Sequence, residues 1–353
     1  MKLRRWKGIL GIVLLVLVAA AGLVGSHMLV TSRKPTVSAA PACPKDQERA
    51  LACYEQYYGS IVAREGVPEA FAALKQQYGR DADVQHLCHA LTHIIGQAAA
   101  RKYSDLPEAF QHGDDACGSG YYHGVLQGFA STLGRDKFVS DLDGVCAGIP
   151  GKERKSLEYY NCVHGLGHGI MAITGNDLFG ALRDCDGLTG TMERDACANG
   201  VFMENVIMDG AHGGHYSKYL KPSEPLYPCT AVEGKYKAAC FDIQTSYALG
   251  AVQGNFAKVF ALCAGVDMPF RTTCYRSLGR DAATTSLDQV AGTIAACDRG
   301  TGHEQRSNCL MGAVLDFVYY YHSDAQAKQL CAAVDPLLQA DCRSTTAKAV
   351  GLF

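Results

Sequence analysis

Cysteine pairs recur at a fixed interval in the second half of this chain, and this repeat constrains the fold more than any other feature of the sequence. In the last four pairs, the first cysteines are 34 residues apart each time. They are Cys229, Cys263, Cys297 and Cys331, and their partners are Cys240, Cys274, Cys309 and Cys342. A constant interval of this size is typical of stacked supersecondary units, each of which buries its apolar face against its neighbours. The sequence therefore predicts a repeat protein.

Each repeat has the pattern of a helical hairpin. A short apolar helix is expected to end near the first cysteine, as in AKVFALC, and about ten polar residues follow. A longer helix is expected to start around the second cysteine, as in CYRSLGRDAATTS. Period-two alternation and hairpin turn dipeptides are scarce, which disfavours strands. The predicted fold class is all-α, with about eight disulfide-stapled α-hairpin units that form a solenoid or a closed superhelix after an N-terminal membrane segment.

The cysteine content predicts disulfides and export. There are 16 cysteines, an even number, and no CxxC pair that would indicate cysteine metal sites. Disulfides persist in oxidising compartments. Cys43 and Cys53 are expected to close a local loop, which leaves Cys88 and Cys117 to pair by elimination. The other expected pairs are 146 with 162, 185 with 197, 229 with 240, 263 with 274, 297 with 309, and 331 with 342.

The N-terminal end predicts membrane targeting. Residues 1–7 are basic, and an uncharged apolar segment follows, GILGIVLLVLVAAAGLVG. Residues 1–25 are interpreted as a signal-anchor or a cleaved signal peptide, with the anchor preferred because the apolar stretch is long enough for a bilayer. Residues 26–42 would be a tether. The expected location is extracytoplasmic, in a periplasm or at a cell surface, with one N-terminal transmembrane helix.

The rest of the chain is interpreted as a single extracytoplasmic helical-repeat domain, residues 43–353. Its expected parts are a histidine-bearing half at 43–209, an inserted loop at 210–228 and regular repeats at 229–353. The insertion is indicated because Cys185 and Cys229 are 44 residues apart instead of 34. The formal net charge of −2 offers no broad basic surface, so a nucleic-acid partner is not expected.

Histidines give the strongest chemical signal. Two pairs have the spacing i and i+4, which places both imidazoles on one helix face, and a fifth histidine stands at a matching distance after a cysteine. The five are His89, His93, His123, His164 and His168. Imidazole suits copper, iron and zinc, so we expect these residues to hold a transition metal ion. Two alternatives remain at this point, namely packed histidines that hydrogen-bond between helices, and metal-free acid–base chemistry.

Other residues are weaker candidates. Glu204 is a candidate metal ligand or general base. The glycine-rich insertion carries His212 and His215, which we assign to catalysis in a lid or substrate loop. Tyr121 and Tyr122, beside His123, are candidates for lining a cofactor site, although packing between repeats explains them equally well.

The architecture resembles cysteine-rich Sel1-like and tetratricopeptide solenoids over roughly residues 130–353, in unit length, hairpin units and one disulfide per unit. That resemblance implies a concave face for a protein or peptide partner. The predicted function is an exported metal-binding protein, with copper- or iron-dependent oxidoreductase chemistry preferred. The alternatives are a non-catalytic binding scaffold and a zinc-dependent hydrolase that uses Glu204.

Overall fold

The described part of the chain consists of helices and turns, without strands, as the repeat pattern predicts. The computed structural model describes residues 41–353 except 46, 212–216, 288, 322 and 352–353. The predicted membrane segment at 1–25 and residues 26–40 of the predicted tether lie outside these residues. No helix that the structure describes is both long and apolar enough to cross a membrane.

The helices fall into a longer and a shorter set that alternate through much of the chain. Their bounds in chain order are α2 Gln47–Arg64, α3 Val67–Tyr78, α4 Ala82–Lys102, α5 Leu106–Gln111, α6 Gly120–Leu133, α7 Arg135–Val139, α8 Leu142–Val145, the 3-10 helix η1 Lys152–Arg154, α9 Leu157–Ile173, α10 Leu178–Cys185, α11 Thr191–Ala211, α12 Gly234–Phe241, α13 Gln244–Ala251, α14 Phe256–Ala264, α15 Met268–Thr285, α16 Val290–Cys297, α17 His303–Tyr321, α18 Ala325–Ala333 and α19 Pro336–Val350.

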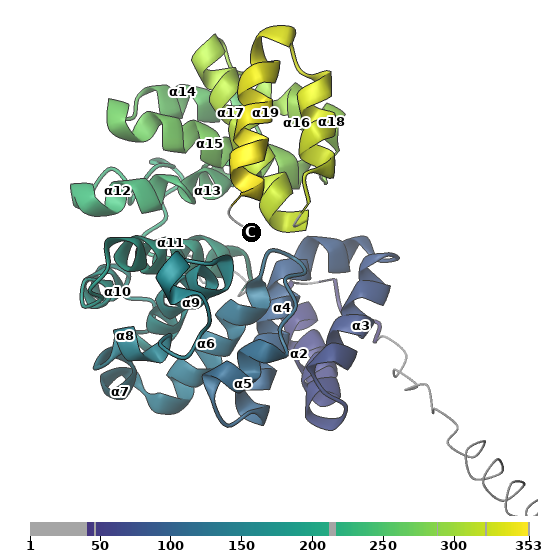
Figure 1. Ribbon diagram of the computed structural model, residues 1–353, viewed down its shortest axis with the longest axis vertical. Helices are drawn as coiled ribbons and strands as arrows, with labels where there is room; N and C mark the ends of the chain where they lie inside the picture. Colours follow the sequence, from purple (N-terminus) through teal and green to yellow (C-terminus); the bar gives the residue numbers. More distant parts are fainter. Residues whose placement is uncertain (1–40, 46, 212–216, 288, 322, 352–353) are drawn as a thin grey trace, which may run out of the picture. The chain divides into compact units, whose positions relative to one another are not determined.

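Successive long helices pack against one another. Helix α4 packs on α6, α6 on α9 and α9 on α11, and the same order continues from α15 to α17 and α19. Figure 1 shows α4, α6, α9 and α11 following one another along the first half of the chain. Residues from repeats that are distant in sequence are therefore brought together on adjacent helix faces.

All eight predicted disulfides are present, which confirms the pairing. The Cα–Cα distances run from 5.4 to 6.0 Å, within the range that a disulfide requires. The bridge between Cys88 and Cys117 has a Cα–Cα distance of 5.6 Å and connects α4 to the turn before α6. It fixes the start of α6 relative to α4.

The predicted helix starts were too late. Helix α15 begins at Met268, well ahead of Cys274, and α17 begins at His303, well ahead of Cys309. Proline in the first turn explains the early start of α15, since the fixed φ of proline suits a first helical turn and its missing N–H costs nothing there. The expected run of ten polar residues is thus mostly helix, and only residues 265–267 connect α14 to α15.

The inserted loop also begins later than predicted. Helix α11 continues to Ala211, so the first residues of the proposed 210–228 insertion are helical. Residues 217–232 form turns, in which Tyr219 is buried. Its ring contacts Phe179, and its hydroxyl donates to Asp177 at 3.0 Å. This end of the insertion is packed structure and not an exposed lid.

Pairs of glycines bring the long helices unusually close. A side chain on Gly96 of α4 would collide with the backbone of α6, and one on Gly124 of α6 would collide with the backbone of His93. Gly167 and Gly200 form a matching pair between α9 and α11. Because backbones touch at these points, side chains one turn away are held in fixed positions between the helices.

Candidate metal centre

The five predicted histidines lie together on α4, α6 and α9. Seven pairs among them have ring centroids 4.6 to 5.6 Å apart. Four of the side chains are buried and His89 is half-buried. Burial of so many polar rings has a free-energy cost unless their nitrogens are paired or coordinate an ion.

The first pair, His89 and His93, has both rings oriented by acceptors behind them. The Nδ1 of His89 lies 2.8 Å from the carbonyl oxygen of Cys117, and the Nδ1 of His93 lies 3.1 Å from the Oε1 of Gln127. An oxygen of this kind only accepts, so each Nδ1 carries the ring proton and donates it. Each Nε2 is then left with a lone pair. The two Nε2 atoms face each other at 3.1 Å.

The amide of Gln127 has its orientation set by its other partners. Its Nε2 donates to the Oε2 of Glu204 at 3.0 Å, and its Oε1 accepts from the Nε2 of Gln97 at 2.9 Å. A carboxylate requires a donor, so the amide oxygen must face His93. This network fixes the tautomer of His93.

Burial keeps the two rings of the first pair neutral. It lowers the pKa of His89 to about 4, and it lowers the pKa of His93 well below its usual value, with the neighbouring His89 adding to the effect. At neutral pH neither Nε2 therefore binds a proton that could bridge the pair. Two lone pairs at 3.1 Å repel each other in the absence of a cation.

The second pair, His164 and His168, repeats this arrangement on α9. The Nδ1 of His168 donates to the Oε2 of Glu204 at 2.5 Å, which directs the lone pair of its Nε2 toward the Nε2 of His164 at 3.1 Å. Burial lowers the pKa of His168 to about 3 and that of His164 well below its usual value. The Nδ1 of His164 is buried without a hydrogen-bond partner among the described residues, so its tautomer is not fixed.

His123 lies between the two pairs. Its ring centroid is 4.6 Å from that of His164 and 4.7 Å from that of His168, and the His123 and His168 rings are nearly parallel at 10°. Burial, followed by the neighbouring His164, lowers its pKa well below the usual value. Its Nδ1 is buried and lacks a hydrogen-bond partner among the described residues. A buried polar nitrogen of this kind is available to a ligand.

The ligand atoms of these residues fall into three groups, in each of which all atoms lie within 4.8 Å of one another. The groups are His89, His93 and His123; His123, His164 and His168; and His93, His168 and Glu204. Three imidazoles in such proximity are a typical transition-metal donor set.

The turn before α6 places the acceptor for His89 in a constrained backbone. Cys117 and Ser119 have φ values of 59° and 62°, in the left-handed region that residues other than glycine rarely adopt. The disulfide to Cys88 holds this turn against α4. The carbonyl of Cys117 thereby points at the ring of His89, an example of backbone strain retained at a site.

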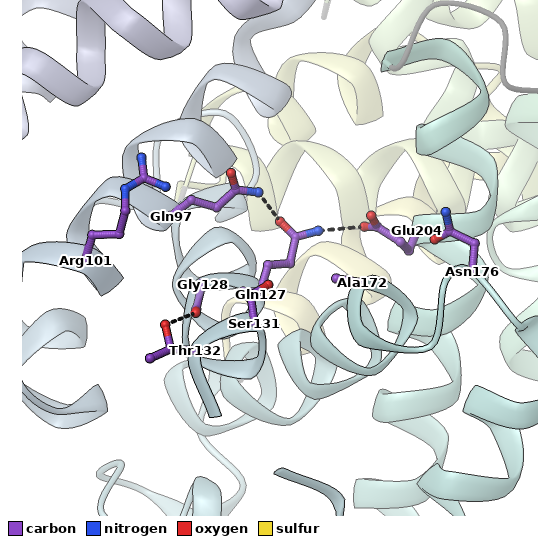
Figure 2. A pocket seen from close by; sticks show the side chains of 9 residues that line it. All are labelled: Gln97, Arg101, Gln127, Gly128, Ser131, Thr132, Ala172, Asn176 and Glu204. Atoms are coloured by element: carbon purple, nitrogen blue, oxygen red, sulfur yellow. Dashed lines mark hydrogen bonds between the residues drawn. The ribbon is translucent and has the colours of Figure 1, made fainter. Parts of the chain in front are cut away.

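A polar pocket of about 400 Å³ lies on the outer side of Gln127 and Glu204. Figure 2 shows the hydrogen-bonded row from Gln97 through Gln127 to Glu204 crossing the pocket, with Arg101 at one end and Asn176 at the other. The same Gln127 and Glu204 side chains contact His93 and His168. A small polar molecule in this pocket would thus lie one hydrogen-bonded layer away from the histidines.

The structure separates the remaining candidates. Glu204 is buried and accepts from His168 and Gln127, so it orients a histidine in addition to being a possible ligand. Tyr121 packs its ring against Phe71 and donates to the carbonyl of Ala109. Tyr122 packs against Phe110. Both tyrosines are core residues, in agreement with the packing alternative. His212 and His215 lie outside the described residues.

Sequence reasoning missed the groups that orient the rings, Gln97, Gln127 and the carbonyl of Cys117. The two glutamines follow the histidine spacing, because Gln97 stands four residues after His93 and Gln127 four after His123. A search for any polar residue at i+4 on these helices would have found them. A backbone carbonyl leaves no such signal.

Comparison of the chain with protein-family profiles, curated proteins and solved structures finds no match. The function is therefore argued from the site alone.

Proposed function

We propose that this protein binds a transition metal at the centre formed by its five histidines. One observation carries the proposal: the Nε2 atoms of His89 and His93 face each other at 3.1 Å while both Nδ1 atoms donate to fixed oxygens. With metal–nitrogen bonds of about 2.0 to 2.1 Å, this separation corresponds to a ligand–metal–ligand angle of about 100°. A cation turns the repulsion of the two lone pairs into coordination.

The hydrogen bonds behind the rings are those expected around metal ligands. Metal-bound histidines typically donate their second N–H to a carbonyl or a carboxylate, which fixes the tautomer and makes the ligand more basic. His89 has the carbonyl of Cys117, His93 the amide of Gln127 and His168 the carboxylate of Glu204.

The donor set favours copper or iron over zinc, and oxidoreductase chemistry over hydrolysis. Zinc hydrolases combine histidines with a carboxylate that is free to act as a base. Here the Oε2 of Glu204 already accepts from both His168 and Gln127. The pocket beside Gln127 and Glu204 is the proposed entry for a small polar substrate.

The setting of this site is proposed to be an exported solenoid. Consecutive packing of the long helices supports stacked repeats, and eight disulfides support an oxidising compartment. The basic and apolar sequence of residues 1–25 supports an N-terminal membrane anchor. A concave face of such a solenoid would be available to a protein or peptide partner.

The proposal is tested on protein purified from an oxidising compartment, stripped with a chelator and titrated with Cu(I), Fe(II) or Zn(II). We expect the parent to bind at least one ion per chain. His93→Ala removes one of the two facing Nε2 atoms and should weaken binding at that pair more than 100-fold, since loss of an outer partner alone costs about 10- to 100-fold. His303→Ala, at the exposed start of α17, is the matched control and should bind as the parent does. Equal binding by the parent and His93→Ala would refute the site.

A further inference from the structure

We infer that the centre holds two ions and not one, with His89 and His93 as the core of one site and His164 and His168 as the core of the other. This inference rests on the proposed function and concerns the number and class of the ions. It is supported by three observations: the repetition of the facing Nε2 pair, the grouping of the ligand atoms, and the position of His123 beside both pairs.

The two pairs are equivalent in geometry. Each consists of histidines four residues apart on one helix, α4 or α9, and in each the Nε2–Nε2 distance is 3.1 Å. Each pair can bind an ion by itself, because an ion beside the pair can lie about 2 Å from both Nε2 atoms, which is the length of a metal–nitrogen bond. The two helices are separated by α6, which packs on both.

The ligand atoms of the five histidines do not form one mutually close set. Two groups consist of histidines alone, one built on each pair, and His123 belongs to both; a third group combines His93, His168 and Glu204. A single ion bound by all five rings would require all five ligand atoms to surround one point. The two all-histidine groups instead describe two positions with His123 as a shared neighbour.

The position of His123 agrees with this division. Its ring centroid is 5.4 Å from that of His93, 4.6 Å from that of His164 and 4.7 Å from that of His168. Helix α6 therefore places a third imidazole close to both pairs, and His123 can complete either site.

Charge indicates the class of ion. The only carboxylate in these ligand groups is Glu204, and an imidazole binds a metal ion in its neutral form. Two divalent ions would place four positive charges in a buried region beside one negative charge, which is electrostatically costly. Two monovalent ions halve this charge. Copper(I) is the monovalent transition metal that imidazole accommodates, so the inferred occupant is a pair of copper(I) ions.

The test is an anaerobic titration of the chelator-stripped protein with Cu(I), with bound copper measured by elemental analysis after desalting. We expect two equivalents for the parent and for His303→Ala. One equivalent is expected for the double variant His89→Gln/His93→Gln and one for His164→Gln/His168→Gln. Glutamine keeps polarity and approximate volume at these buried positions, and circular dichroism checks the fold of each variant.

The outcomes separate this inference from the proposed function. One equivalent in the parent would overturn the two-ion inference and leave the metal centre intact. Two equivalents that are both lost, or both kept, when one pair is replaced would overturn the assignment of one ion to each pair. No copper, iron or zinc bound by the parent would overturn both proposals. The parent stoichiometry decides between one and two ions even if a variant fails to fold.

Discussion

The histidine-bearing half and the C-terminal repeats place polar residues at equivalent positions on their helices. The hydrogen-bond partners of these polar residues differ between the two regions. Counted from the preceding cysteine, His93 on α4 corresponds to Thr245 on α13, and Glu204 on α11 corresponds to Asp281 on α15. In the C-terminal half, Asp281 accepts from Thr245 at 2.6 Å, and Arg280 donates to it at 2.8 Å. In the histidine half, unprotonated nitrogens face one another.

This difference shows what the scaffold itself requires. The C-terminal cluster pairs its donors with its acceptors, so it is complete as protein and serves to lock α13 onto α15. In the histidine cluster, His89, His93 and His168 direct their Nδ1 donors outward, to oxygens on neighbouring elements, and their Nε2 acceptors inward. The same repeat therefore supports a structural network in one half and the proposed cation site in the other. Four predictions sharpen this contrast, from the largest expected effect to the smallest.

The largest stability loss is expected from Asp281→Ala in the C-terminal cluster. Removal of this carboxylate leaves Arg280 without its hydrogen-bonded carboxylate in a largely buried position, which costs about 3 to 5 kcal/mol of unfolding free energy. Metal binding should be unchanged. Chemical denaturation and a copper titration of the same sample measure both quantities. Loss of copper binding in a folded Asp281→Ala protein would mean that the two halves are not functionally separate.

Removal of single disulfides should distinguish the halves in a second way. Replacing Cys88 and Cys117 by serine, or Cys297 and Cys309 by serine, should in each case cost about 2 to 4 kcal/mol. Only the first replacement releases the turn whose carbonyl accepts from His89. We therefore expect weaker metal binding from the first variant alone, measured by titration below its unfolding midpoint. Equal metal affinities in the two variants would contradict this role of the turn.

Gln127→Leu should weaken metal binding about 10- to 100-fold, or about 1.4 to 2.8 kcal/mol. The change removes the acceptor for His93 and the donor to Glu204 while keeping a similar volume. Gln244→Leu is the matched control, because Gln244 is also buried and donates to the carbonyls of Pro225 and Tyr227. It should destabilise the fold without changing metal affinity. Metal affinity is measured by competition with a chromophoric chelator. Equal affinities for the two variants would mean that the hydrogen bonds of Gln127 do not contribute to metal binding.

The smallest effect is a pH dependence of the metal-free protein. The folded pKa values of His89 and His168, about 4 and about 3, lie below the usual value of about 6.5. Between pH 6.5 and 4 the unfolded chain binds more protons than the folded chain, so stability should fall as the pH falls through this window. A His89→Gln/His168→Gln variant should show a shallower decline. Identical pH profiles of unfolding free energy for parent and variant would contradict the assigned burial.

The sequence predicted the histidines and the disulfides of this site, but not the hydrogen bonds that join its helices. The spacing of His164 and His168 and the constant cysteine interval arise within one repeat, so they are visible in a single sequence. The hydrogen bond from Gln127 to Glu204 joins residues 77 positions apart, and only the close packing of the helices brings them together. Such contacts depend on the tertiary arrangement and leave no local pattern.

The errors have the same origin. The predicted start of α15 at its cysteine overlooked the first-turn signal of the Asp-Met-Pro sequence before it. The glycine-rich insertion was predicted to be a lid or substrate loop, although the contacts of Tyr219 with Phe179 and Asp177 make that residue part of the core. Composition shows where a chain departs from its repeat, but not which of the departing residues are packed.

The most direct test of a metal centre in the histidine half is a crystal structure of copper-loaded protein with anomalous data collected on both sides of the copper absorption edge. We expect anomalous density about 2.0 to 2.1 Å from the Nε2 atoms of His89 and His93, and none at the cluster of Asp281 and Arg280. If the histidine rings keep their positions and no anomalous density lies within bonding distance of them, the facing nitrogens are not metal ligands and the central claim is wrong.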